Sequence, residues 1–215
     1  GAHPELLVLG YLRNQRLVES VFDIESITVD WDVHAAAVQT RQGIARIEER
    51  TASKVVTTGC GQGSVFGGLM DEVDRIVLPE ARLSQAQLYG IVNAIRLKET
   101  TYKSAGSVHG CALFRGEELL TFVEDVGRHN AIDTLVGYML VEGLNPADHM
   151  IISSGRIASE IAQKAVRAGV PVFASLSRAM SRAVDIARAT GLTLLGNVKS
   201  GSMHIYHENG QLVLP

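Results

Sequence analysis

The sequence predicts an α/β fold with a mostly parallel sheet between layers of helices. From residue 54 onward, short apolar runs of strand length alternate with segments whose apolar residues recur every three or four positions, which is the helical period. Glycines follow several of the helical segments, as is typical of helix C-termini. Strands joined by helices of this length favour a parallel sheet covered on both faces, so we expect a three-layer sandwich.

Residues 1–50 have a different pattern, which predicts a small N-terminal α+β subdomain ahead of a main domain at 51–215. Leucines between Leu6 and Leu17 predict a helix followed by a turn. Residues 24–33 and 38–47 alternate or run apolar, which predicts two strands.

The first part of the main domain contains two helices and a hairpin. Ser84 with Gln87 has the pattern of a capping box, so we expect a helix to begin there and to continue to Ile95. Two apolar runs at 111–114 and 119–123 predict a hairpin, and a long apolar stripe predicts a helix over 128–141.

Strand and helix units follow in close order to the end of the chain. A strand at 150–153 leads into a helix that ends at Gly169, and a strand at 172–174 leads into a helix that ends at Gly191. Strands at 192–198 and 203–207 complete the predicted sheet.

The composition is that of a globular protein and argues against a nucleic-acid-binding or membrane-spanning protein. The chain has 215 residues with 46% hydrophobic and 20% charged, which is typical of a globular protein. A net charge of −3 argues against general nucleic-acid binding, and no apolar run approaches the roughly 18 residues that span a membrane. The two cysteines, Cys60 and Cys111, do not form a disulfide framework, so we expect a reducing, cytoplasmic setting.

Cys60 is the first candidate for chemistry. It lies in the glycine-rich stretch 57–64, directly after the apolar pair at 55–56. Backbone with few side chains leaves a thiol accessible to a large partner, and the thiolate is the reactive form of cysteine. The alternative is a small buried cysteine in a turn, the role that we expect for Cys111 at the start of its strand.

Polar segments follow four of the predicted strands and predict a ligand site. In open α/β sheets ligands bind beyond the carboxyl ends of the strands, and helix N-termini bind phosphate there. No Walker A or Rossmann glycine pattern is present, so the usual ATP and NAD sites are not expected. The candidate binding residues are Arg128, Ser154, Arg156, Asn197, Val198, Lys199, Ser200, Gly201 and Ser202.

His109 and His129 are candidates for proton handling, with hydrogen-bonded structural histidines as the alternative. The pair His109 and Cys111 also suggests a metal site. Zinc sites use several ligands at tight spacing, and the chain lacks the paired cysteines of zinc deaminases, so we expect no metal.

These segments, in this order, resemble the formate dehydrogenase accessory sulfurtransferases, also called FdhD or NarQ proteins. The similarity runs from about Pro4 to Tyr206, and its most specific parts are 124–133, 154–157 and 191–206. Residues 5–12 resemble an early helix of the family. A family member normally has some tens of residues before that helix, so the N-terminal subdomain is expected to be truncated here.

The resemblance implies a cytidine-deaminase-like fold without the zinc, and a homodimer. It implies that the protein is an enzyme, a sulfurtransferase with a cysteine persulfide intermediate on Cys60. The sulfur would come from a cysteine desulfurase and would go to the molybdenum or tungsten bis(guanine dinucleotide) cofactor of formate dehydrogenase. Residues 197–202 correspond to the segment that binds this cofactor.

One position departs from the family pattern. Many members have C-x-x-C in the reactive segment, and here Gly63 occupies the second cysteine position. Persulfide chemistry on one cysteine is compatible with this change, whereas a two-cysteine scheme is not. Two alternatives stay open: a cofactor-binding chaperone or carrier without sulfur chemistry, and a zinc nucleoside deaminase.

Overall fold

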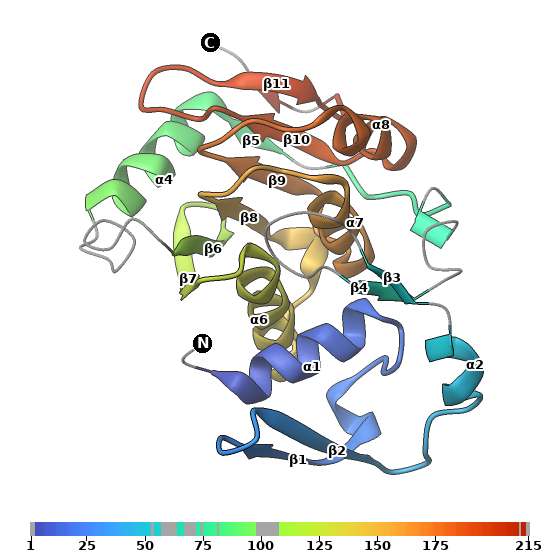
Figure 1. Ribbon diagram of the computed structural model, residues 1–215. Coiled ribbons are helices and arrows are strands. Elements are labelled where there is room, and N and C mark those ends of the chain that lie inside the picture. The colour runs from blue at the N-terminus through green and yellow to red at the C-terminus, as the bar shows by residue number, and fades with distance from the viewer. Residues whose placement is uncertain are drawn as a thin grey trace.

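The computed structural model describes residues 3–52, 54–56, 64–66, 72–73, 75–80, 82–97, 108–210 and 212–213 (Figure 1). Its first elements include one long helix, short helices and two small antiparallel sheets. They are α1 (Pro4–Asn14), the 3-10 helix η1 (Val21–Asp23), β1 (Ile24–Asp30), β2 (Ala35–Thr40), α2 (Ile47–Ala52), β3 (Lys54–Val56) and β4 (Ser64–Phe66).

The remaining elements build one six-stranded sheet with its helices, and a separate two-stranded sheet of β5 and β12. They are β5 (Leu83–Ser84), α4 (Gln85–Leu97), β6 (His109–Arg115), β7 (Glu118–Asp125), α6 (Arg128–Val141), η2 (Pro146–Asp148), β8 (Met150–Ser153), α7 (Ser159–Ala168), β9 (Val172–Ser175), α8 (Ser181–Thr190), β10 (Thr193–Gly196), β11 (His204–His207) and β12 (Leu212–Val213).

The large sheet is mixed, and the prediction of a mostly parallel sheet is wrong. Its strand order is β11-β10-β9-β8-β6-β7. Parallel pairing joins only β8 to β9 and β9 to β10, while β6 pairs antiparallel with β7 and β8, and β11 pairs antiparallel with β10. The reason lies in the connections, because a tight turn joins β6 to β7 and residues 197–203 join β10 to β11. Such connections are shorter than the dozen or so residues that a parallel crossover needs.

Helices cover both faces of this sheet, which gives the expected three layers (Figure 1). Alternate residues of each central strand enter different cores. Leu113, Ile151 and Phe173 pack in a large cluster beneath α6, α7 and α8. Phe114 and Ile152 pack in a smaller cluster against α4. The strands are buried on both faces, which explains why they read as continuous apolar runs rather than alternating ones.

Several local predictions are confirmed. Ser84 Oγ accepts from the backbone N–H of Gln87 at 3.0 Å, and Gln87 Oε1 accepts from the backbone N–H of Ser84 at 3.0 Å, as in a capping box. Gly169 and Gly191 end α7 and α8 in the left-handed conformation, with φ of 82° and 80°. The helix α6 has the predicted bounds.

The second predicted N-terminal strand is misplaced. The hairpin turns through His34, which has a φ of 53°, so β2 begins earlier than predicted and ends at Thr40. Ile47 begins the helix α2 instead of ending a strand. Glu48 and Glu49 lie in the first turn of α2, where acidic side chains interact favourably with the helix dipole.

The helix α1 packs along α6 at very short range. A Cβ on Gly10 would lie 1.7 Å from the Asp133 backbone oxygen, and a Cβ on Gly137 would lie 1.9 Å from the Leu6 backbone oxygen. Only glycine permits such an approach of two helix backbones. Because α1 covers its outer side, α6 is buried on nearly all sides. The division of the chain near residue 50 stays a prediction.

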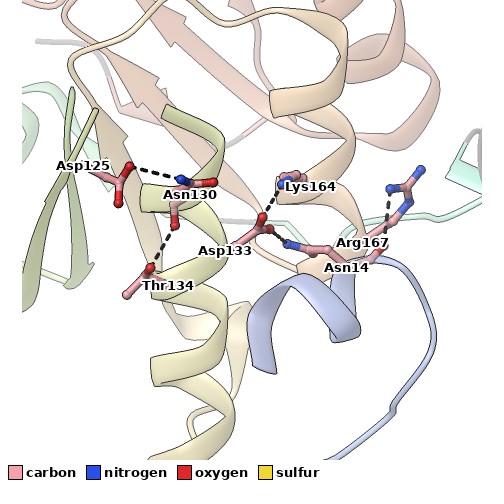
Figure 2. Close-up of polar contacts among 7 residues, drawn as sticks. All are labelled: Asn14, Asp125, Asn130, Asp133, Thr134, Lys164 and Arg167. Carbon is pink, nitrogen blue, oxygen red and sulfur yellow. Dashed lines mark hydrogen bonds and ion pairs between the residues drawn. The ribbon is translucent and has the colours of Figure 1, made fainter. Parts of the chain in front are cut away.

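Buried polar side chains join α1, α6 and α7 (Figure 2). Lys164 Nζ lies 2.5 Å from Asp133 Oδ2, and their side chains are 6% and 3% exposed. Asn14 Nδ2 donates to Asp133 Oδ1 at 2.6 Å, and an Arg167 guanidinium nitrogen donates to the Asn14 backbone oxygen at 3.3 Å. Burial raises the pKa of Asp133, while Lys164 opposes that shift. We call these four residues the buried charge network.

Across the described residues, none of the helices combines the length and the hydropathy that crossing a bilayer requires.

Candidate functional site

One edge of the large sheet collects the polar segments that the sequence singled out. Because β6 is antiparallel to both β7 and β8, those two strands point the same way, together with β9 and β10. The segments after all four strands therefore meet at this edge, as predicted, and β6 begins there with His109. We call it the carboxyl edge.

Buried hydroxyl groups hold the turns at this edge. Ser153 Oγ accepts from the backbone N–H of Gly155 at 3.1 Å. Ser175 Oγ donates to the Gly155 backbone oxygen at 2.6 Å and accepts from the Ser177 N–H at 3.0 Å. Ser154 Oγ, a predicted binding group, accepts from the backbone N–H of Gly110 at 3.0 Å. These contacts fix the backbone beyond β8 and β9, so a ligand there would meet a preformed surface.

Cationic and imidazole side chains gather around Gly155. A Cβ at this position would lie 3.2 Å from His109 Nδ1 and 3.3 Å from Arg128 Cδ, so glycine lets both side chains approach the turn. Arg128 is half-buried, and Arg156, the next residue after Gly155, is exposed. Both guanidinium groups are close enough to lower the pKa of His109, after burial as the main cause. The predicted residues His109, Arg128 and Arg156 thus form one positively charged patch.

His129 lies just behind this patch. It is 5% exposed, and its Nδ1 has no hydrogen-bond partner within the described part of the chain. Burial, and then the positive charges of Lys164 and Arg128, lower the pKa of His129 to about 4. His129 is therefore neutral near pH 7. A role of either histidine in proton handling stays a prediction.

Asp125 fixes the start of α6 next to the patch. Its Oδ1 accepts from the backbone N–H of Gly127 at 2.8 Å and from Asn130 Nδ2 at 3.2 Å (Figure 2). Gly127 is the N-cap residue and has no side chain to cap α6, and Asp125 holds its backbone and the Asn130 side chain from the preceding turn. This contact directs the first turn of α6, with Arg128, toward the carboxyl edge.

Residues 197–202 form the other part of the edge, beyond β10. Asn197 has a φ of 48°, a left-handed conformation that asparagine tolerates, and its N–H donates to the Ser177 backbone oxygen at 2.8 Å. The Lys199 N–H donates to the Ser202 backbone oxygen at 2.8 Å, which closes a turn. Val198 is fully buried in the smaller core, so its side chain packs and only its backbone faces the edge. Binding by this segment stays a prediction.

The structure describes only one of the two cysteines, Cys111. Cys60 lies between β3 and β4, outside the described residues. Cys111 has no exposed surface, its Sγ donates to Ser153 Oγ at 3.4 Å, and burial raises its thiol pKa to about 12. A thiol of that pKa is protonated at neutral pH and unreactive, so the prediction that Cys111 packs in the core is confirmed.

Two residues that position α6, Asp125 and Lys164, were not predicted from the sequence. Asp125 could have been found from its position two residues before the N-cap glycine of a helix. Lys164 could have been found because it lies on the apolar stripe of its helix, between Ile161 and Ala168, where a charge needs a buried partner. Across the described residues, no three His, Cys, Asp or Glu side chains gather as a metal site would require.

Comparison with known proteins finds relatives over nearly the whole chain. The sequence model of the FdhD/NarQ family matches residues 1–213. The Sulfur carrier protein FdhD of Saccharolobus solfataricus is 34% identical over 203 residues, which cover 93% of this chain and 76% of that protein. The Sulfur carrier protein FdhD of Streptomyces coelicolor is 35% identical over 207 residues, covering 92% of this chain and 73% of that protein.

The fold also matches a solved structure. A crystal structure of a candidate formate dehydrogenase accessory protein from Desulfotalea psychrophila superposes with a TM-score of 0.76 at 20% identity. The match covers 98% of this chain and 80% of that one, so the mixed α/β fold extends over the whole chain. The cytidine-deaminase-like classification of this fold stays a prediction.

Proposed function

The chain belongs to the FdhD/NarQ family, and on that basis we propose that it is a sulfur carrier whose carrying residue is Cys60. It would receive sulfur from a cysteine desulfurase as a persulfide. It would deliver that sulfur to the molybdenum or tungsten bis(guanine dinucleotide) cofactor of a formate dehydrogenase, and this cofactor is its substrate. Relatives that are about a third identical bear the name Sulfur carrier protein FdhD, which supports the carrier role.

The burial of Cys111 is the observation that carries the assignment to Cys60. The chain has two cysteines, and Cys111 is buried between β7 and β8 with a thiol pKa of about 12. A persulfide needs a thiolate that can reach a donor protein, and Cys111 offers neither the thiolate nor the access. A cysteine persulfide on this chain therefore requires Cys60, and Gly63 leaves no neighbouring thiol to resolve it.

The transfer from the donor is a thiol exchange that consumes no oxidant. The Cys60 thiolate attacks the outer sulfur of a desulfurase persulfide, the sulfur–sulfur bond of the donor breaks, and the donor cysteine leaves as a thiolate. Cys60 then bears the outer sulfur.

The dimensions and charge of the carboxyl edge support a large phosphorylated substrate. Four strand spacings separate β10, next to residues 197–202, from β7, next to Arg128, or about 19 Å at roughly 4.8 Å per strand. Arg128 beyond β7, Arg156 beyond β8 and Lys199 beyond β10 provide cations for phosphate groups along this edge. We propose that Ser154 and residues 197–202 complete this binding surface in a cytoplasmic homodimer.

Mass spectrometry after incubation with a cysteine desulfurase and cysteine tests the proposal. We expect the peptide that contains Cys60 to gain the mass of one sulfur atom. Cys60→Ala should abolish the adduct, and Cys111→Ala should retain it, because Cys111 is buried. An adduct on Cys111 alone would refute the assignment. If Cys60→Ala fully restores formate dehydrogenase activity in cells that lack this protein, the chain is instead a cofactor-binding carrier without sulfur chemistry.

A further inference from the structure

A cavity of about 320 Å³ lies between the last turns of α1 and α6, away from the carboxyl edge. Apolar side chains of α6 and of the following loop line it, including Val136, Met139, Leu140 and Pro146. Leu140 is twelve residues beyond Arg128, or about 18 Å along the helix at roughly 1.5 Å per residue. The cavity is therefore separate from the carboxyl edge.

Two charged side chains, Arg13 and Glu19, line this cavity beside the apolar ones. They form a long ion pair, and within the described structure the Arg13 guanidinium has no hydrogen bond to the Glu19 carboxylate. One terminal nitrogen is buried without any hydrogen bond, and the other lies 3.8 Å from Glu19 Oε2, beyond hydrogen-bond distance. The Glu19 side chain is 72% exposed and the Arg13 side chain 20%, so water competes for the carboxylate. Burial is also the main cause that lowers the pKa of Arg13.

A buried charged donor without an acceptor is costly, and few proteins keep one unless something pairs with it. We propose that this cavity binds a small apolar monocarboxylate, with the carboxylate on the Arg13 guanidinium and the apolar part against α6. Guanidinium and carboxylate pair through two parallel hydrogen bonds, which the distant Glu19 does not provide. At about 30 Å³ for each water-sized group, the cavity holds roughly ten non-hydrogen atoms.

Octanoate, an acid with an eight-carbon chain, has that size and is the probe for the test. We expect it to shift backbone amide NMR signals of α1 and α6 saturably. Octan-1-ol has the same carbon chain without the charge and should cause no saturable shift. Arg13→Met keeps an apolar stem of similar length and should weaken octanoate binding about ten- to a hundredfold, the usual effect of losing a charged hydrogen bond. Glu19→Gln removes the competing carboxylate and should strengthen it.

Two further variants separate the site from general effects. Leu140→Trp fills the cavity without changing its charge and should abolish octanoate binding. Arg115→Met removes an exposed arginine that pairs with Glu118 at 2.8 Å, and it should bind octanoate like the original chain. The proposal is overturned if octanoate gives no saturable shift, if octan-1-ol binds equally well, or if Arg13→Met or Leu140→Trp leaves the affinity unchanged. Octanoate binding is measured without sulfur transfer, so these outcomes are independent of the sulfur-carrier proposal.

Discussion

The first two turns of α6 hold charge in opposite ways. At its first turn Arg128 is half-buried beside the exposed Arg156, and both face a surface where a ligand can approach. One turn later Asp133 and Lys164 form an ion pair that is almost wholly buried against α1. An exposed charge can be removed at little cost to the fold, whereas a buried partner cannot. The comparison therefore separates residues that serve binding from residues that serve assembly of the helices.

The largest effect is expected from breaking the buried ion pair. Lys164→Met leaves the Asp133 carboxylate buried without its cation, so the free energy of unfolding should fall by about 3–5 kcal/mol. Urea denaturation measures this change. Adding Asp133→Asn removes the second charge and keeps an acceptor for Asn14, so the double variant should recover much of the loss. A double variant as unstable as Lys164→Met alone would contradict the buried-charge explanation.

Acid should destabilise the chain through His129. Its pKa is about 4 when folded and near its ordinary 6.5 when unfolded, so between these values the unfolded chain binds the extra proton. The free energy of unfolding should therefore fall on acidification through this range, by up to about 1.4 kcal/mol per pH unit. Unfolding of His129→Gln should show a smaller slope with pH. His204→Gln removes an exposed histidine and should leave the slope unchanged; equal slopes in all three proteins would refute the prediction.

Alanine at two helical glycines should change stability in opposite directions. Gly137→Ala places a methyl group 1.9 Å from the Leu6 backbone oxygen, so α1 must shift and about 1–3 kcal/mol should be lost. Gly90→Ala in α4 meets only Glu117 Oε1 at 3.8 Å, so the better helix propensity of alanine should add about 0.5–1 kcal/mol. Thermal unfolding of the two variants is the measurement. A stabilising Gly137→Ala would mean that α1 does not pack on α6 as described.

The smallest effect on stability is expected at the carboxyl edge. Arg156→Ala removes an exposed charge and should change the free energy of unfolding by less than about 0.5 kcal/mol. It should nevertheless weaken binding of GDP, the nucleotide part of the proposed substrate, about tenfold or more. Arg188→Ala, in the last turn of α8 at the opposite end of the sheet, should change neither quantity. Calorimetric titration with GDP measures the affinity. An unchanged affinity in Arg156→Ala would show that Arg156 is not part of the binding site.

The sequence predicted most of the main domain because its signals there are local. Capping residues, left-handed glycines and apolar periodicity placed α4, α6 and the strands from β6 to β10. Strand direction depends on pairing between distant segments, so the predicted hairpin of β6 and β7 and the antiparallel β11 were not recognised as making the sheet mixed. The N-terminal hairpin turn was predicted at 34–37 instead of 31–34, because no glycine or proline marks the turn.

In the candidate site, too, features set by local sequence could be predicted, whereas contacts between distant segments could not. Polar residues directly after strands could be assigned to one edge, because the carboxyl ends of parallel strands meet there. The approach of His109 and Arg128 to Gly155 could not be predicted, because these residues come from three different segments of the chain. The pairing of Asp133 with Lys164 likewise depends on how α6 packs against α7.

The burial of Cys111 also determines how the chain can be labelled. A thiol-specific reagent can modify at most one cysteine of the folded chain, because Cys111 has no exposed surface. A spin label or fluorophore attached to a cysteine of the folded chain can therefore occupy only Cys60. Modification of Cys111 requires β6 to lose its packing in the large core, so the appearance of a chain with two modified cysteines would report, over time, how fast the central sheet opens.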